Sequence, residues 1–291
     1  MARVSDRPRL LRTIAEARQS VQAVRREGRQ VALVPTMGYL HEGHLALVER
    51  ARQEADFVVV SIFVNPLQFG PREDFASYPR DLDRDLGLLR QQGMADAVFA
   101  PSVDEMYPQP MRTEVSLPTL SDRLCGQSRP GHFTGVATVV SKLFHIVQPD
   151  VACFGQKDGQ QLAIIQRMVA DLNFPVRIVG VPTVREPDGL AKSSRNVYLT
   201  PEEREHAVVL YRTLSWAKDA ILAGERRADV IRQGMRERIE ADPIARLDYA
   251  DLVSMPDLEP IERIEGDIML AVAAYFGKAR LIDNFQFHVD P

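Results

Sequence analysis

Two histidines, His41 and His44, stand three residues apart in a short segment, residues 35–44, that also contains Gly38 and Gly43. The segment follows an apolar run typical of a strand and precedes a run with helical periodicity. A helix that begins here offers unpaired backbone N–H groups and a partial positive charge, and both favour an anionic ligand. The glycines permit a tight turn and a close approach of the ligand to the backbone. The pattern therefore indicates a nucleotide-binding turn.

Three other interpretations of this segment are possible. A P-loop requires a lysine and a hydroxyl residue after its second glycine, whereas this chain has His44 and Leu45. A zincin requires histidines four residues apart and a third ligand, and the sequence offers neither. The third alternative is an ordinary strand-to-helix turn that carries two surface histidines. The rest of the chain must decide between that turn and a phosphate site.

A second candidate segment reads FGQKDGQQ over residues 154–161. It also follows an apolar run and precedes an amphipathic one, so Lys157 lies where a strand of an open parallel sheet ends. Ligands bind at that edge of such sheets. A surface lysine in a simple turn is the alternative.

A third segment, residues 185–196, follows the apolar run at residues 176–184 and contains two hydroxyls and a guanidinium. These groups can hydrogen-bond phosphate oxygens, and the guanidinium can do so with two bonds at once. Taken alone, the segment could equally be a solvated turn. The groups in question belong to Ser193, Ser194 and Arg195.

The hydrophobic pattern predicts the elements that position these segments. We expect a helix over residues 9–27, then strands near residues 31, 57, 97, 151 and 176 that alternate with helical stretches. This alternation is typical of an α/β protein with a doubly wound, Rossmann-like parallel sheet.

The character of the sequence changes after the third segment. Thr-Pro-Glu-Glu at residues 200–203 has the form of a capping box with proline at the first helical position, and it predicts one long helix ending near Gly224. A helix over residues 229–241 and strands at 248–254, 268–276 and 279–285 complete a small α+β domain. We therefore expect an N-terminal domain over residues 1–186 and a C-terminal lid domain over residues 187–291. The serine–arginine segment would then lie at the hinge.

Composition excludes several classes of protein. The 291 residues, 45% of them hydrophobic, suffice for one large domain and a smaller one. A net charge of −4 and a pI near 5.9 argue against a nucleic-acid partner. No run approaches the roughly 20 apolar residues of a membrane span, and the charged N-terminus lacks a signal peptide's apolar core, so we expect a cytoplasmic chain with no membrane partner. Cys125 and Cys153 form no C-x-x-C pair, which predicts neither disulfides nor a zinc site.

Five segments, in a fixed order, carry a resemblance to a known family. They read PTMGYLHEGH from Pro35, FVNPLQFGPREDFASYPRD from Phe63, GHFTGVATVVSKLFHIVQPD from Gly131, FGQKDGQQ from Phe154 and LAKSSRN from Leu190. Together they resemble the pantothenate synthetase (pantoate–β-alanine ligase) family over essentially the whole chain. The first and last also resemble the HIGH and KMSKS signatures of the wider nucleotidyltransferase superfamily. The resemblance implies that pantoate attacks ATP to give pantoyl adenylate and pyrophosphate, and that β-alanine then displaces AMP to form pantothenate.

The resemblance also implies roles for individual residues. The family's proton donor maps onto His44, and His41 and Lys157 are further donors to the reacting phosphates. The pantoate pocket maps onto Gln68 and Gln161. Their neutral amides can orient a carboxylate without lowering its nucleophilicity as a bidentate arginine would. Gln68 can also help define the β-alanine site. The implied ATP-binding residues are Met37, Gly38, Tyr39, Leu40, His41, Glu42, Gly43, His44, Gly155, Gln156, Lys157, Asp158, Val184, Lys192, Ser193, Ser194 and Arg195.

Three further expectations concern the metal, the assembly and one unusual residue. Mg²⁺ is expected with ATP, and Asp81 and Asp85 on one face of a probable helix could reach it through water, although its protein ligands are unknown from the sequence. The resemblance implies a homodimer assembled through the first domain. The family's hinge segment commonly reads Met-Ser-Ser-Arg, and here Lys192 replaces the methionine. We expect its side chain to point to solvent, because a second cation beside Arg195 would have to be desolvated on closure. The alternative is that it points at phosphate and tightens ATP binding through a charge-assisted contact.

Two other functions stay open at this stage. Another nucleotidyltransferase, which moves AMP onto a phosphate, would share the H-x-G-H pattern but would not respond to pantoate. A non-catalytic nucleotide sensor would bind ATP without releasing pyrophosphate.

Overall fold

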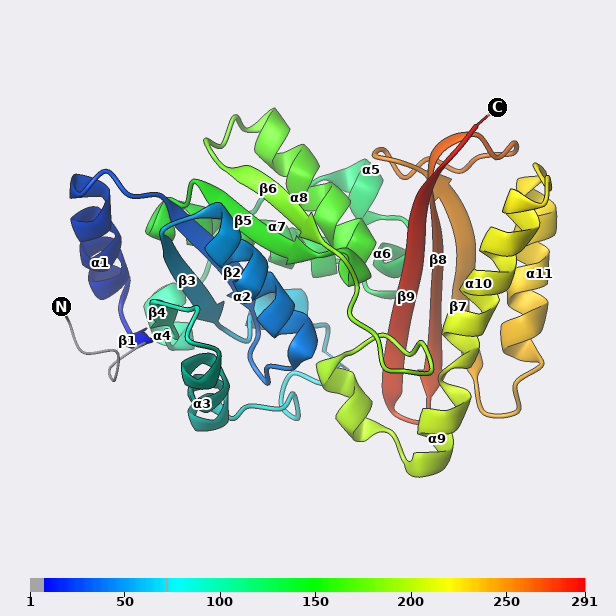
Figure 1. Cartoon of the computed structure of the whole chain (residues 1–291), viewed down its shortest axis with the longest axis horizontal. Coiled ribbons are helices and arrows are strands. Elements are labelled where there is room, and N and C mark those ends of the chain that lie inside the picture. Colours follow the sequence, from blue (N-terminus) through cyan, green and yellow to red (C-terminus); the bar gives the residue numbers. More distant parts are fainter. Residues whose placement is uncertain (1–7, 72, 291) are drawn as a thin grey trace. The chain divides into compact units, whose positions relative to one another are not determined.

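A computed structural model describes residues 8–71 and 73–290 of the chain, which forms two compact units (Figure 1). Unit 1 comprises Met1–Ser121, Arg129–Gly155 and Ile164–Val181, and unit 2 comprises Asp122–Ser128, Gln156–Ala163 and Pro182–Pro291. Two short segments of unit 2 are thus inserted, in sequence, within unit 1. Two contiguous domains divided after residue 186 stay a prediction.

Unit 1 is built on a six-stranded parallel sheet, which confirms the predicted doubly wound α/β fold. The strand order is β1-β4-β3-β2-β5-β6. Their bounds are β1 (Arg9–Leu11), β2 (Val31–Thr36), β3 (Phe57–Ile62), β4 (Ala97–Phe99), β5 (Val151–Gly155) and β6 (Arg177–Val181). The adjacent strands β2 and β5 pair in parallel, and the chain leaves β2 toward β3 but leaves β5 toward β6. The topological switch point, where such sheets bind ligands, therefore lies at the carboxyl ends of β2 and β5.

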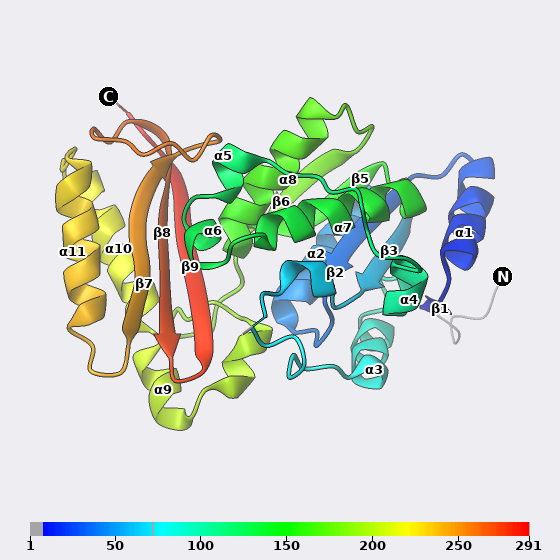
Figure 2. The same ribbon diagram turned by 180° about the vertical axis from the view of Figure 1, so that it is seen from behind.

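Helices cover both faces of this sheet, with α2 on one face and α7 on the other (Figures 1 and 2). Because both faces are covered, the central strands are continuous apolar runs, and the first four residues of β2 are fully buried. The longer helices are α1 (Ile14–Arg26), α2 (Glu42–Glu54), α3 (Leu82–Gln92), α7 (His132–Val147) and α8 (Gly159–Asp171), of which Ile164 onward belongs to unit 1. Shorter turns are η2 (Pro66–Gln68), α4 (Val103–Met106) and α5 (Pro118–Ser121).

The predicted helix over residues 9–27 is wrong at its start. Residues 9–11 form β1, which pairs in parallel with β4, and α1 begins only at Ile14. The cause is a capping box in which Thr13 accepts the N–H of Glu16 and Glu16 accepts the N–H of Thr13. That cap fixes the first turn of the helix and frees the preceding residues to join the sheet.

Unit 2 contains the antiparallel sheet β7-β8-β9, with β7 (Arg246–Ser254), β8 (Gly266–Phe276) and β9 (Ala279–Val289). Two helices, α10 (Val209–Leu222) and α11 (Ala228–Glu240), pack against it and bury an apolar core that includes Leu214, Ile231 and Leu270. The predicted small α+β arrangement is therefore confirmed. The remaining elements are α6 (Cys125–Ser128), η3 (Gln156–Asp158), η4 (Ser194–Tyr198) and α9 (Pro201–His206).

The single long helix predicted from Thr200 is also wrong. The capping box forms as expected, with Thr200 and Glu203 bonded reciprocally, but α9 ends at His206 and α10 begins at Val209. Ala207 and Val208, between the two helices, are both buried, and the N–H of Leu210 closes a three-residue turn by donating to the Ala207 carbonyl at 3.3 Å. The change of direction lets two consecutive residues enter the core. No helix in the described part of the chain combines the length and apolarity of a membrane span.

A close contact inside unit 1 requires a glycine in α7. A Cβ atom on Gly135 would lie 2.2 Å from the carbonyl oxygen of Leu67 and 2.7 Å from the backbone nitrogen of Gln68. A Cβ atom on Gly87, in the middle of α3, would have no neighbouring atom within 4 Å. Of these two helical glycines of unit 1, Gly135 therefore has no room for a side chain, whereas Gly87 does.

We expect Gly135→Ala to lower the free energy of unfolding by about 1–3 kcal/mol, because the methyl group forces α7 away from η2. Gly87→Ala should raise it by about 0.4–1 kcal/mol, since alanine restricts the unfolded chain and clashes with nothing. Chemical denaturation of the two variants beside the unmodified chain measures both values. Equal stability of the two variants would contradict the tight packing of α7 on η2.

Candidate active site

The turn after β2 adopts a backbone conformation that only glycine accepts readily. Gly38 has a φ of +82°, and a Cβ atom there would lie 2.9 Å from Ile62 Cγ2. The next residue, Tyr39, also has a positive φ of 51°. The carboxylate of Asp85 holds this turn, since it accepts the N–H of Tyr39 at 2.8 Å and the N–H of Leu40 at 2.7 Å. A long-range polar contact therefore fixes the segment that the sequence singled out.

Asp81 and Asp85, which the sequence suggests could reach a metal through water, both hold backbone groups of the fold. Asp85 is 1% exposed and both of its oxygens accept backbone N–H groups, while Asp81 caps α3 by accepting the N–H of Arg84. Burial raises the pKa of Asp85 above its ordinary value, and the bonds from Leu40 and Tyr39 oppose that shift. Among the described residues, no group of three His, Cys, Asp or Glu side chains could hold a metal ion.

The two histidines form a reciprocal cap at the start of α2. Nδ1 of His41 accepts the N–H of Gly43 at 3.1 Å, and Nδ1 of His44 accepts the N–H of His41 at 3.3 Å. A ring nitrogen that accepts a hydrogen bond carries no proton, so both neutral rings carry their hydrogen on Nε2. The ring centroids are 4.1 Å apart. Gly43 is required because a Cβ atom there would lie 2.8 Å from the His41 ring. The cap thus fixes two Nε2–H donors at a helix N-terminus.

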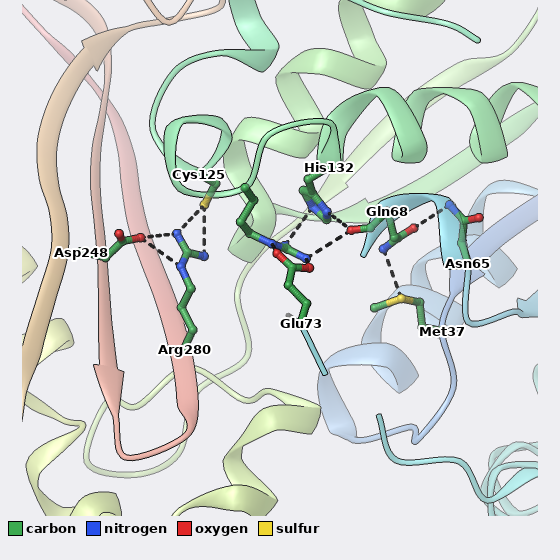
Figure 3. Close-up of polar contacts among 9 residues, drawn as sticks. Met37, Asn65, Gln68, Glu73, Cys125, His132, Asp248 and Arg280 are labelled. Atoms are coloured by element: carbon green, nitrogen blue, oxygen red, sulfur yellow. Dashed lines mark hydrogen bonds and ion pairs between the residues drawn. The ribbon is translucent and has the colours of Figure 1, made fainter. Parts of the chain in front are cut away.

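The amide of Gln68 is fixed by neighbours within unit 1, as Figure 3 shows. Its Oε1 accepts from Nδ2 of Asn65 at 3.1 Å, and its Nε2 lies 3.2 Å from the sulfur of Met37. The Asn65 amide can face only one way, because its Oδ1 accepts the hydroxyl of Tyr107 at 2.7 Å and its Nδ2 also donates to the Gly135 carbonyl. Gln68 therefore offers N–H donors, which suit the oxygens of a carboxylate or hydroxyl.

The turn after β5 is held from within unit 2 by an asparagine of β9. Nδ2 of Asn284 donates to the carbonyl of Gln156 at 2.9 Å and to that of Lys157 at 2.8 Å. The ammonium of Lys157 lies 3.8 Å from Asp158, and Gln161 follows as a half-buried residue in the first turn of α8. The backbone around Lys157 is thus fixed, while its ammonium makes a long and therefore weak ion pair.

The serine–arginine segment follows a narrow hairpin in which Arg185 bridges to Ala191. Arg185 holds this hairpin, donating to both oxygens of buried Asp283 at 2.6 and 2.9 Å. Ser193 then caps η4, because its hydroxyl oxygen accepts the N–H of Arg195 at 3.2 Å. The hydroxyl hydrogen of Ser193 is not consumed by that bond and can still be donated to a ligand.

The expectation that Lys192 points to solvent is wrong. Its ammonium lies 3.2 Å from a carboxylate oxygen of Glu186, and its side chain is only 18% exposed. The backbone N–H of Lys192 donates to the carbonyl of Val184 at 3.0 Å, so Lys192 and Val184 face each other across the hairpin. An acidic neighbour in the same hairpin neutralises the added cation.

The sequence-predicted residues fall into two groups. Residues 37–44, Gln68 and Gly155 belong to unit 1. Within this unit the side chains of Met37 and Gln68 are in contact, and so are the rings of His41 and His44. Those at 156–158, 161, 184 and 192–195 belong to unit 2. Sequence reasoning missed Asp85, Tyr107 and Asn284 as the residues that hold these segments. Their signal was weak, since each acts on a partner distant in sequence.

Comparison with known proteins shows the family to which the chain is similar. A family model described as Pantoate-beta-alanine ligase matches residues 9–286. The chain is 57% identical to the pantothenate synthetase of Moorella thermoacetica over 281 residues, which is 97% of this chain and 99% of that protein. It is 56% identical to the pantothenate synthetase of Geobacillus thermodenitrificans over 271 residues, 93% of each chain.

Two solved structures are similar over nearly the whole length. A pantothenate synthetase from Thermus thermophilus has a TM-score of 0.90 at 51% identity and covers 97% of this chain and 100% of its own. A pantoate–β-alanine ligase from Francisella tularensis, solved as a complex with beta-gamma ATP and β-alanine, has a TM-score of 0.76 at 33% identity. That comparison covers 95% of this chain and 97% of the other.

We expect Asp85→Asn to lower the free energy of unfolding by about 1–3 kcal/mol, because an amide cannot accept both backbone N–H groups and leaves one buried donor unpaired. The matched control is Asp83→Asn, an exposed residue of the same helix, which should cost about 0.5 kcal/mol through the lost charge near the helix N-terminus. Chemical denaturation of both variants decides the matter, and indistinguishable values would show that Asp85 does not hold the turn.

Proposed function

The chain belongs to the pantoate–β-alanine ligase family, and on that premise we propose that it condenses pantoate with β-alanine to give pantothenate, AMP and pyrophosphate from ATP. The observation that carries the proposal is the histidine cap of α2 at the carboxyl end of β2, in a chain that matches the family over residues 9–286. The strand end, the helix N-terminus and two Nε2–H donors together suit the phosphates of a nucleotide.

In the first step a carboxylate oxygen of pantoate attacks the α-phosphorus of ATP. A bond forms between these atoms, the bond from the α-phosphorus to the bridging oxygen breaks, and pyrophosphate leaves with the electron pair. Negative charge grows on the phosphate oxygens, so fixed donors lower the barrier by a few kcal/mol each. We assign this role to His44 and His41, whose tautomers the cap sets. The further donors proposed are Lys157, Ser193, Ser194 and Arg195.

The remaining ATP contacts are proposed on the family resemblance. The Met37–His44 and Gly155–Asp158 segments would contact phosphate and ribose, and Val184 and Lys192 would contribute from the hairpin. Lys192 would enter this set through its backbone carbonyl, because its ammonium pairs with Glu186 and its N–H donates to the Val184 carbonyl.

In the second step the amine of β-alanine attacks the acyl carbon of pantoyl adenylate. The amide C–N bond forms, the bond from the acyl carbon to the phosphate oxygen breaks, AMP leaves, and the nitrogen loses a proton. Gln68 and Gln161 would orient pantoate, since amide N–H donors hold a carboxylate without the full neutralisation that a guanidinium brings. The fixed orientation of the Gln68 amide suits this task.

Mg²⁺ would enter with the nucleotide. Mg²⁺ is usually held by substrate phosphates, waters and at most a few carboxylates. The lack of a three-ligand cluster among the described residues fits such a shared site better than a site made by protein alone. The ion would supply charge neutralisation to the leaving pyrophosphate. A homodimer and a cytoplasmic location stay predictions from the sequence.

We expect the chain to catalyse exchange between ATP and labelled pyrophosphate with pantoate alone, because adenylate formation precedes attack by the amine. β-Alanine should not be needed. Exchange that appears only after β-alanine is added would contradict a separate adenylate. Exchange without pantoate would point instead to a different acceptor, and ATP binding without any exchange would indicate a nucleotide sensor.

We expect His44→Ala and Lys157→Ala each to slow adenylate formation by about two to three orders of magnitude, the usual effect of removing one fixed donor. Gln161→Ala should chiefly raise the KM for pantoate. Single-turnover kinetics measure the rates, with exposed His145→Ala and Lys278→Ala as matched controls. An unchanged adenylation rate in His44→Ala would remove this residue from the mechanism.

A further inference from the structure

Three side chains of unit 1 form what we call the clamp: His132 and Arg129, which contact the backbone of Gln68, and Glu73, which holds Arg129. Nδ1 of His132 lies 2.8 Å from the carbonyl oxygen of Gln68, and a guanidinium nitrogen of Arg129 lies 3.4 Å from the same oxygen. Arg129 binds both carboxylate oxygens of Glu73 at 2.7 Å. Figure 3 shows the ring of His132 directed at the Gln68 carbonyl. None of the three has a role in the function proposed above.

The contacts of Arg129 determine which nitrogen of His132 carries hydrogen. NH1 of Arg129 lies 3.1 Å from Nε2 of His132, and a guanidinium can only donate, so Nε2 must accept and carry no proton. Nδ1 is therefore the N–H that donates to the Gln68 carbonyl. Burial alone would raise the pKa of Glu73, but Arg129 outweighs it and the pKa lies below its ordinary value, so the carboxylate stays ionised and keeps Arg129 in place.

The clamp and the side-chain contacts of Gln68 act at opposite ends of the same residue. The amide is oriented by Asn65, which is itself bonded to α7 through the carbonyl of Gly135. His132 is the first residue of α7, so one helix fixes both the backbone and the amide of Gln68. A residue held at both ends presents its N–H donors in one direction, and this preorganisation favours binding.

We propose that His132 and Arg129 are positioning residues that set the direction of the Gln68 amide and thereby the affinity for the hydroxy acid substrate. The inference rests on the proposed function, in which Gln68 contacts pantoate. Loss of the Nδ1–H donor lets the Gln68 peptide turn and moves the amide away from the substrate oxygens. Binding of ATP, which uses other segments, is unaffected.

Three variants of His132 separate the donor from the ring. In His132→Asn the side-chain nitrogen occupies the position of Nδ1 and can still donate to the Gln68 carbonyl, whereas in His132→Gln the amide reaches only the position of Nε2. His132→Leu removes both. We expect the KM for pantoate to rise about tenfold in the Gln and Leu variants, equal to about 1.4 kcal/mol, and less than threefold in the Asn variant. The KM for ATP should stay within twofold in all three.

The matched control is His145→Leu, the same substitution at an exposed position of the same helix, with thermal unfolding recorded for every variant. It should leave the KM for pantoate unchanged. Equal effects of Asn and Leu, or a parallel rise in the KM for ATP, would overturn the proposal in favour of a merely structural histidine. If the unmodified chain showed no pantoate-dependent exchange, the proposed function itself would fail.

A double-mutant cycle with Gln68→Ala tests whether the clamp acts through the Gln68 side chain. Once that side chain is removed, His132→Leu should change the KM for pantoate by less than twofold further, because no amide remains to be oriented. Glu73→Gln, which weakens the hold on Arg129, should give a smaller rise that the Gln68→Ala background also abolishes. Fully additive effects in these cycles would overturn the role assigned to His132 and Arg129.

Discussion

The turn that carries both histidines depends on one buried carboxylate. Gly38 and Tyr39 adopt positive φ angles, which disfavour a residue with a side chain, and without a partner their backbone would relax. Asp85 accepts the N–H groups of Tyr39 and Leu40, so it fixes the turn and with it the point where α2 begins. The hydrogen bonds that cap α2, and the donors that they aim, follow from that starting point.

Several groups assigned to substrates also serve the fold. His41 and His44 cap a helix, Ser193 caps another, and the amide of Gln68 belongs to a network with Asn65. Because these side chains are already hydrogen-bonded within the fold, they cannot rotate freely, and a ligand meets donors that are already oriented. It also means that a substitution at such a position changes stability together with activity. Stability measurements are therefore needed before a lost rate is attributed to chemistry.

The sequence sufficed for features that neighbours along the chain determine. The five predicted strands and the Thr200–Glu203 cap arise from local periodicity and residue type, and they were readable. Features set by distant partners were not. The three residues of β1 are too few to show a hydrophobic period, and they form a strand only because they pair with β4. The break after His206 depends on the burial of Ala207 and Val208 in the core. Asp85 resembles any other acidic residue of a helix in the sequence, and its role follows only from its contacts with Tyr39 and Leu40.

The charge at Lys192 illustrates the same limit and shows how a departure from the family is accommodated. A cation added next to Arg195 favours anion binding directly when it faces the anion, and indirectly when it neutralises a nearby carboxylate. Lys192 does the second, because Glu186 lies 3.2 Å away in the same hairpin and the two form a neutral pair. A methionine at this position would leave the carboxylate without that cation. A partly exposed pair of this kind contributes about 0–1 kcal/mol to stability. Its larger effect is on the local electrostatic potential, in which Arg195 is then the cation that no residue of this pair offsets.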